Sequence, residues 1–243
     1  MLKFYEIPLY FPKGCKAHAA MGSIFHGALM ERLEPALAKA FHQQAMRPYR
    51  QTVFYDKKRK QSFWQLGIFS EEAERGILHA LRQSPYLYLK QQGYEIQLGP
   101  FSCQADTVEH IFQQCSSAAG AEITFCSTTG FKRNGAYVLF PESALLYHSV
   151  ILRWPLLASK VLEPSLEKML DYYTIIQRYD LHTELFSVDG HSIPGFAGTI
   201  GLRFCGNKQI NQIAAALLRC AVYTGIGIKT ALGMGAVRVR IKE

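Results

Sequence analysis

The segment of this sequence whose residue types most clearly suit ligand binding is a glycine-rich loop at residues 225–235. Glycine permits positive φ and leaves main-chain N–H groups accessible, while Lys229 and Thr230 add a cation and a hydroxyl. This combination suits the phosphates of a polyanion. The glycines of the loop are Gly225, Gly227, Gly233 and Gly235.

The loop does not match the common nucleotide-binding motifs. A Walker loop has glycine directly before its lysine, whereas Ile228 precedes Lys229. A dinucleotide fingerprint leaves a strand and opens a helix, but here a predicted helix at 207–223 comes first and a predicted strand at 236–241 follows. The remaining alternative is a helix C-cap with a long turn, which explains one glycine more easily than four.

Histidines supply the side chains suited to proton transfer, because an imidazole with a pKa near ~6.5 can accept or donate a proton at neutral pH. The sequence has eight of them. No His-x-x-x-His or Asp-x-Asp cluster gathers ligands on one face, so we predict no metal site and no cofactor. The six cysteines form no Cys-x-x-Cys pair and are typical of reduced thiols.

The chain carries an excess of positive charge, because 27 Lys and Arg against 19 Asp and Glu give a formal net charge of +8. Such an excess favours polyanionic partners through long-range attraction and counterion release. No apolar run approaches the roughly 20 residues that cross a bilayer, and the first residues contain no signal-peptide core. We therefore expect a cytoplasmic protein without membrane contact.

The first half of the chain has the element order β-α-β-β-α-β, which is that of a ferredoxin-like domain. Apolar residues at helical spacing predict a helix over 23–41, which Pro35 should kink or split, and another over 70–83. The basic turn 57–60 falls at the tip of a predicted hairpin. Alternating side chains predict strands at 2–11, 51–55, 62–69 and within 86–98.

The second half repeats this order after a polar segment, 102–120, that we interpret as a linker. The predicted domains are therefore residues 1–119 and 120–243. The sequence predicts an α+β protein of tandem ferredoxin-like domains, with the glycine-rich loop near the C-terminus. The expected elements are strands at 121–127, 181–188, 198–204 and 236–241, a hairpin at 135–139, and helices at 142–152, 164–178 and 207–223.

Several segments occur in the order of one protein family. Residues Ile123-Thr-Phe-Cys-Ser-Thr-Thr-Gly-Phe-Lys132, Tyr137-Val-Leu-Phe-Pro141 and Ser149-Val-Ile-Leu-Arg-Trp154 are followed by Gly195-Phe-Ala-Gly198 and the glycine-rich loop. Through these segments the chain resembles the RAMP (repeat-associated mysterious protein) endoribonucleases that process CRISPR precursor RNA. The resemblance covers most of residues 120–243 and is looser in the first half.

The resemblance implies a metal-independent cut in CRISPR repeat RNA by the substrate's own 2′-hydroxyl, leaving 5′-hydroxyl and 2′,3′-cyclic phosphate ends. The family places a general acid/base histidine at the end of its first helix, here His42. Some members have a second histidine near the start of that helix, matched by His26. Sixteen residues on one ideal helix lie roughly 160° apart in rotation and about 24 Å apart along the axis. Both histidines can reach one phosphate only if the chain folds back around Pro35.

The sequence departs from other family members at two positions. Met30 stands where they have a tyrosine, and Arg47 is the nearest cation where they have a lysine. Arg47 can stabilise a transition state but cannot readily act as an acid. These departures keep a second hypothesis open, a catalytically inactive CRISPR RNA-binding subunit on the same fold. A metabolic enzyme that holds a phosphorylated small molecule in the glycine-rich loop is a third.

The expected RNA contacts outside the loop are basic residues in separate places. Lys132 and Arg133 follow Phe131, whose ring could stack a base. On the last strand, alternation puts Arg238 and Arg240 on one face with Lys242. The turn 57–60 is a weaker candidate, because charged turns are usually just solvated. CRISPR repeat RNA is the expected partner, and a homodimer and a CRISPR effector complex stay open.

Overall fold

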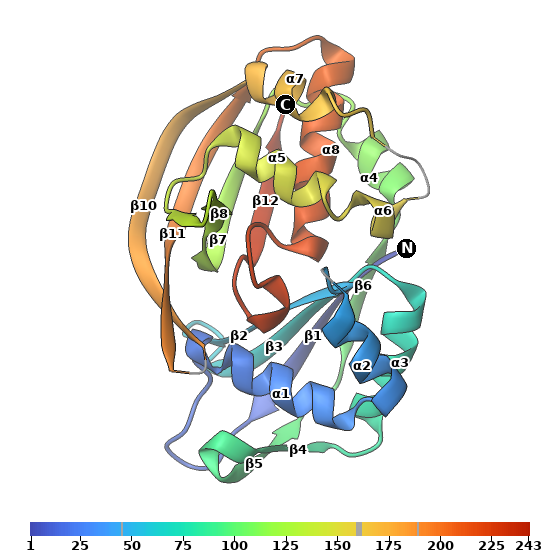
Figure 1. The fold of residues 1–243 in the computed structure, drawn as a ribbon, viewed down its shortest axis with the longest axis vertical. Coiled ribbons are helices and arrows are strands. Elements are labelled where there is room, and N and C mark those ends of the chain that lie inside the picture. Colours follow the sequence, from blue (N-terminus) through green and yellow to red (C-terminus); the bar gives the residue numbers. More distant parts are fainter. Residues whose placement is uncertain (45, 159–161, 189) are drawn as a thin grey trace.

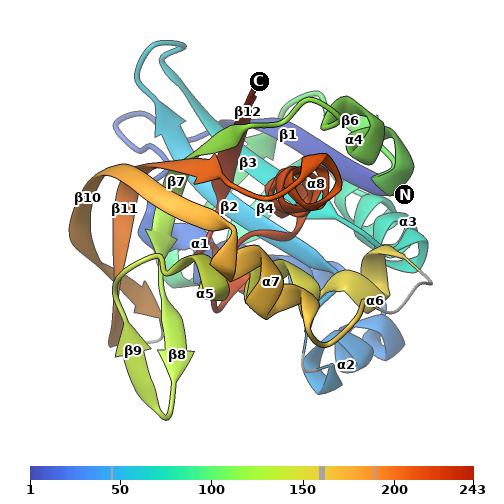
Figure 2. The same cartoon turned by 90° about the horizontal axis from the view of Figure 1, so that it is seen from above.

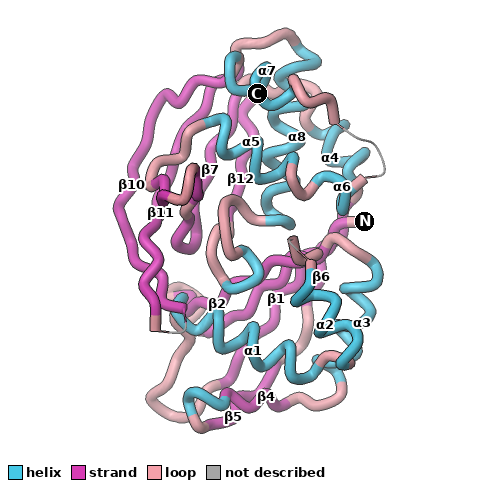
Figure 3. The backbone as a smooth tube through the Cα atoms, viewed as in Figure 1, coloured by secondary structure: helices cyan, strands magenta, loops and turns pink. Residues whose placement is uncertain are grey.

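The computed structural model describes residues 1–44, 46–158, 162–188 and 190–243. Two antiparallel sheets, each covered by helices on one face, form the two halves of the molecule (Figure 1). In Figure 3 the strands of the upper half lie beside helices α5 and α8, and those of the lower half beside α1 and α3. None of the described helices is long and apolar enough to cross a membrane.

The lower half contains the first sheet, in the order β2-β3-β1-β5-β4, with β6 also paired to β1. The order β2-β3-β1-β6 is that of a ferredoxin-like sheet with all neighbours antiparallel. The elements are β1 (Leu2–Tyr10), η1 (Ala19–Met21), α1 (Gly22–Arg32), α2 (Pro35–Gln43), β2 (Tyr49–Asp56), β3 (Gln61–Ile68), α3 (Glu71–Arg82), β4 (Tyr86–Leu89), η2 (Lys90–Gln92), β5 (Tyr94–Leu98) and β6 (Ser102–Asp106).

The upper half contains the second sheet, in the order β10-β11-β7-β12, which repeats the ferredoxin-like arrangement. Its core joins that sheet to α4, α5 and α8. The elements are α4 (Val108–Gln114), β7 (Gly120–Thr129), β8 (Phe131–Arg133), β9 (Ala136–Val138), α5 (Ser143–Ile151), α6 (Trp154–Leu157), α7 (Leu166–Tyr172), β10 (Thr174–Val188), β11 (His191–Phe204), α8 (Lys208–Thr224), η3 (Thr230–Leu232) and β12 (Val237–Lys242).

The helix predicted over 23–41 is split, as Pro35 indicated. α1 ends at Arg32, and Leu33 and Glu34 take extended backbone conformations before Pro35 begins α2. A proline disfavours the helical conformation in the residue before it, yet its fixed φ suits the first helical position. The chain therefore turns sharply between two short helices.

Two element predictions are wrong. The segment 102–120 is not a plain linker, because it contains β6 and α4, and α4 packs on α8 in the upper core. The helix predicted over 164–178 ends at Tyr172, and β10 begins at Thr174. Pairing with β11 overrides helix propensity there, since Ile175 and Ile176 are β-branched and suit a strand. The division at residues 119 and 120 stays a prediction.

Buried polar side chains connect the two halves. The guanidinium of Arg50 on β2 donates from Nε and Nη2 to the carbonyl oxygen of Val222 on α8, at 3.0 and 2.6 Å. Gln51 donates from Nε2 to the carbonyl oxygens of Gly22 and Ala231, at 3.0 and 2.8 Å. Ala231 also packs in the lower core. Figure 1 shows this C-terminal loop, in red, reaching from α8 down to α1.

Candidate active site

His26 and His42 lie beside each other at the fold-back between α1 and α2. Their ring centroids are 6.4 Å apart with an interplanar angle of 83°. The side chain of His26 is buried, whereas that of His42 is exposed. The structure therefore brings together two histidines that a single straight helix would hold far apart.

Tyr49, the first residue of β2, completes the cluster and was not predicted. Its hydroxyl lies 2.7 Å from Nδ1 of His26, a hydrogen-bonding distance, and its ring packs against Phe41. The side chain is fully buried, and burial raises the pKa of the Tyr49 hydroxyl. Tyr49 thus stays protonated and fixes the orientation of the His26 ring. No spacing in the sequence marks it, because its position depends on how β2 packs beneath α1 and α2.

The electrostatic surroundings keep His26 neutral at physiological pH. Burial, followed by the positive charge of Arg47 and the nearby His42, lowers the pKa of His26 to about 4. Arg47 is only partly exposed, and its buried Nε has no hydrogen-bond partner among the described residues. A guanidinium with one unpaired donor, close enough to lower the pKa of His26, is suited to an anionic group such as a phosphate.

The glycine-rich loop is packed between the two halves of the molecule. The amides of Gly225, Gly227 and Gly235 donate to Ala221, to Ser149 Oγ and to Thr128, at 2.8, 2.9 and 3.0 Å. The expectation that these glycines offer free N–H groups is therefore wrong for this conformation, and their contact with RNA stays a prediction. Gly233 is buried too.

Glycine is required in this loop by close backbone contacts. At Gly235, φ is +69°, and an added Cβ would clash with the carbonyl oxygen of Ile226. A Cβ on Gly227 would clash in the same way with Gly130. The side chain of Thr230 is buried, but that of Lys229, at φ 54°, is exposed. The loop thus holds one exposed cation on a tightly packed turn.

Comparison with known proteins identifies the family. The model for CRISPR-associated endoribonuclease Cas6 matches residues 123–237. A CRISPR-associated endoribonuclease Cas6 of Streptococcus thermophilus is 31% identical over 230 residues, which are 90% of this chain and 91% of the relative. The chain belongs to the Cas6 family. A Cas6 endoribonuclease of Mycobacterium tuberculosis is 24% identical over 228 residues, covering 91% of this chain and 72% of the relative.

Solved Cas6 structures share the whole fold. A Thermus thermophilus Cas6 product complex aligns with a TM-score of 0.82 and 20% identity, covering 99% of this chain and all of its own. A Cas6-related protein of Pyrococcus furiosus aligns with a TM-score of 0.66 and 13% identity over the full length of both chains. These likenesses confirm the tandem ferredoxin-like fold.

The basic residues predicted to bind RNA differ in their surroundings in this Cas6 chain. Arg133 forms a two-point ion pair with Glu142, at 2.7 and 2.8 Å, and Arg240 pairs with Glu122 at 2.8 Å. Arg238 and Lys132 are exposed. Phe131 is buried, so the base-stacking role expected for it is wrong; the exposed aromatic ring beside Lys132 is that of Tyr137.

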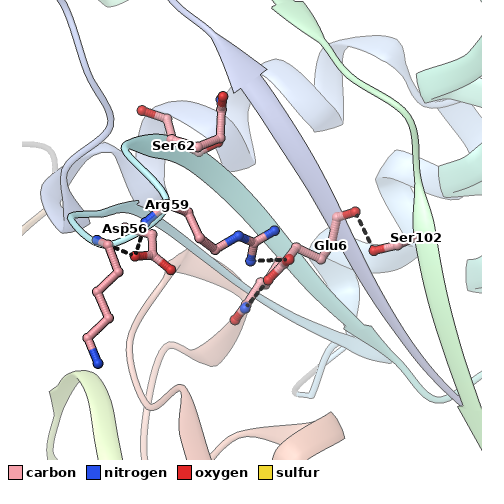
Figure 4. Close-up of polar contacts among 8 residues, drawn as sticks. Glu6, Asp56, Arg59, Ser62 and Ser102 are labelled. Carbon is pink, nitrogen blue, oxygen red and sulfur yellow. Dashed lines mark hydrogen bonds and ion pairs between the residues drawn. The ribbon is translucent and has the colours of Figure 1, made fainter.

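The basic turn 57–60 is a hairpin tip, as predicted, and Figure 4 shows how it is held. Asp56 accepts hydrogen bonds from the amides of Lys58 and Arg59, at 2.8 and 3.1 Å. Arg59 pairs with Glu6 at 2.7 Å and lies over the ring of Phe63. One of the tip's cations is thus neutralised within the protein.

In the described part of the chain, no group of three or more His, Cys, Asp or Glu side chains is arranged to hold a metal ion. The cluster of His26, His42, Arg47 and Tyr49 instead offers two imidazoles, a cation and a hydroxyl. That set can move protons and stabilise an anion.

Proposed function

We propose that this chain binds CRISPR repeat RNA within a precursor transcript and cuts it through the substrate's own 2′-hydroxyl. The observation that carries this proposal is the convergence of His26 and His42, 6.4 Å apart between ring centroids, with Arg47 close enough that its charge lowers the pKa of His26. Cleavage of this kind needs one proton acceptor, one proton donor and a cation for the phosphorane. All three are in the cluster.

The proposed roles follow from burial and charge. His26 is neutral and held by Tyr49, so it accepts the proton of the 2′-hydroxyl as that oxygen attacks the adjacent phosphorus. The approaching phosphate favours this step, because a nearby negative charge raises the pKa of an imidazole. His42 is exposed and donates a proton to the departing 5′-oxygen. The products carry a 2′,3′-cyclic phosphate and a 5′-hydroxyl.

Arg47 stabilises the charge that develops on the phosphorane, and Lys229 holds the RNA backbone near the glycine-rich loop. Further backbone contacts come from Lys132 and Arg238, whose side chains are exposed. Arg133 and Arg240 join them if RNA displaces their carboxylate partners, since exposed ion pairs are weak. Membership of a CRISPR effector complex stays a prediction.

The test is incubation in EDTA with the repeat RNA and with a copy that carries a 2′-deoxy nucleotide at the cut. We expect cleavage of the first alone, because only that RNA has the attacking oxygen. Tight binding of both without cleavage would contradict the proposal and favour the inactive RNA-binding subunit. If mononucleotides saturate the binding site and their affinity depends little on salt concentration, the result would favour the small-molecule enzyme instead.

A further inference from the structure

Gln51 on β2 is a fully buried glutamine whose amide group joins α1 to the glycine-rich loop. Its Nε2 donates to the carbonyl oxygens of Gly22, on α1, and Ala231, in the loop, at 3.0 and 2.8 Å. Its Oε1 accepts a hydrogen bond from Nε1 of Trp64 at 2.6 Å. Because an indole N–H can only donate, Trp64 fixes the amide in the orientation that directs Nε2 towards both carbonyls.

The carbonyl of Gly22 links this amide to His26. In an α-helix the N–H of each residue donates to the carbonyl four residues earlier, so the N–H of His26 shares the Gly22 oxygen with Gln51. The hydroxyl of Tyr49, two residues before Gln51 on β2, lies 2.7 Å from Nδ1 of His26. Alternate residues of a strand face the same side, so one face of β2 holds both the ring and the backbone of this histidine.

The start of α1 and the glycine-rich loop meet backbone to backbone. An added Cβ on Gly22 would clash with the carbonyl oxygen of Leu232 and would lie 3.0 Å from Cα of Gly233. In Figures 1 and 2 the loop, drawn in red, lies beside α1. Two backbones packed this closely leave little freedom for one element to slide along the other.

The same compact turn carries Lys229, whose exposed side chain is the proposed RNA contact of the loop. The carbonyl oxygen of Lys229 accepts the N–H of Leu232 at 2.9 Å and that of Met234 at 3.3 Å. These bonds make this part of the loop a single unit. The bridge at Gln51 therefore fixes the distance between the cation proposed to hold the RNA backbone and the histidine proposed to accept a proton from it.

We propose, on the basis of the RNA cleavage proposed above, that Gln51 is a positioning residue that determines which phosphodiester bond is cut. It keeps the turn with Lys229 at one distance from His26, so that a single phosphate of the bound strand lies against the histidines. A misplacement of about 1 Å costs on the order of 10²-fold in rate. A loosened bridge therefore slows the correct cut and lets neighbouring phosphates compete with it.

The experiment maps the product ends when repeat RNA is cut in EDTA by the unchanged protein and by Gln51→Met. Methionine retains an unbranched side chain but cannot donate to either carbonyl. We expect the unchanged protein to cut one bond. Gln51→Met should cut that bond about 10- to 100-fold more slowly in single turnover and should add cuts at adjacent bonds. RNA affinity should be unchanged, because Lys229 keeps its charge.

A matched pair of glycine variants on α1 tests the contact by a second route. Gly22→Ala forces α1 and the loop apart, so it should spread the cuts in the same way as Gln51→Met. An added Cβ at Gly27 meets open space, so Gly27→Ala should leave the cut position unchanged. Circular dichroism identifies a temperature at which every variant is folded, and cleavage is compared at that temperature.

Cleavage by Gln51→Met at the original bond alone, at the original rate or more slowly, would overturn the positioning role. Loss of stability slows an enzyme without moving its cut, so the position of the product ends separates the two effects. That result would leave the proposed function intact. If the unchanged protein does not cut the RNA at all, the proposed function fails, and the positioning role fails with it.

Discussion

The imidazole of His26 meets that of His42 edge-on, although sixteen residues separate them in the sequence. The break at Leu33 and Glu34 before Pro35 makes this possible, because it lets α2 fold back towards the start of α1. One of the rings is buried and neutral, and the other is exposed. The proposed roles, proton acceptor for His26 and proton donor for His42, rest on this difference.

Replacing His42 with alanine removes the exposed side chain that we propose as the proton donor. We expect His42→Ala to slow single-turnover cleavage in EDTA by about 10²- to 10⁴-fold, the usual contribution of general acid–base catalysis. Binding of the repeat RNA should be unchanged. His79→Ala, an exposed histidine on α3, is the matched control. Unchanged cleavage by His42→Ala would remove His42 from the mechanism.

Tyr49→Phe tests whether the tyrosine hydroxyl positions His26. The ring is retained, so the core should stay packed, but Nδ1 of His26 loses its partner at 2.7 Å. We expect kcat to fall on the order of tenfold, about the value of one hydrogen bond, with KM little changed. Tyr147→Phe removes a similarly buried hydroxyl, 2.7 Å from Thr174, and should not alter cleavage. Equal effects of both variants would indicate a general loss of stability.

Stability should fall in acid because of His26. Its pKa drops from about 6.5 in the unfolded chain to about 4 in the fold, so the unfolded state binds a proton first. The contribution of neutral His26 to the free energy of unfolding is fully present above about pH 6.5 and is lost as the pH falls towards 4. Between pH 7 and 4, urea unfolding of the unchanged protein should lose on the order of 3 kcal/mol more than His26→Gln. If the unchanged protein and His26→Gln lost equal free energy of unfolding between pH 7 and 4, this role of His26 would be contradicted.

The packing of the glycine-rich loop can be tested with two matched glycines. Gly235 and Gly135 have φ values of +69° and +82°, but an added Cβ meets the Ile226 carbonyl at Gly235 and open space at Gly135. Gly135→Ala should cost about 1–2 kcal/mol for the left-handed backbone. Gly235→Ala should cost about 1–3 kcal/mol beyond that for overpacking. Similar denaturant midpoints for the two variants would rule out this close contact.

Lys229→Ala should weaken RNA binding without affecting stability, because this side chain is exposed on the loop. Loss of one phosphate contact to single-stranded RNA reduces the slope of log K against log salt by about 0.7. Titrations at several salt concentrations measure that slope. Lys168→Ala, an exposed lysine on α7, should leave it unchanged. An unaltered slope for Lys229→Ala would exclude Lys229 from the RNA path.

Local signals in the sequence were enough to predict the fold, whereas His26, His42 and Arg47 were predicted from the family resemblance. Pro35 indicated the break between the helices, and the element order indicated the two ferredoxin-like halves. Tyr49 could not be found in this way, because its contact with His26 depends on packing between β2 and α1. Residues 174–178 were predicted as helix because nothing local reveals that β11 will pair with them.

The glycine-rich loop shows a different limit of sequence reasoning. Its four glycines indicated a special backbone, which the positive φ values confirm. They did not indicate which partners the amides would find, since Ser149 and Thr128 are distant in sequence. A glycine motif predicts conformation better than it predicts which groups remain free for a ligand.

The buried amide of Gln51 has a consequence for how the protein is made. It joins the first turn of α1, through Gly22, to Ala231, which follows Gln51 by 180 residues in the sequence. Until Ala231 has been synthesised and has left the ribosome, the helix that carries His26 lacks this support. We therefore expect the cluster of His26, His42, Arg47 and Tyr49 to mature only after the glycine-rich loop has docked, so that a chain cut short before this loop is no nuclease.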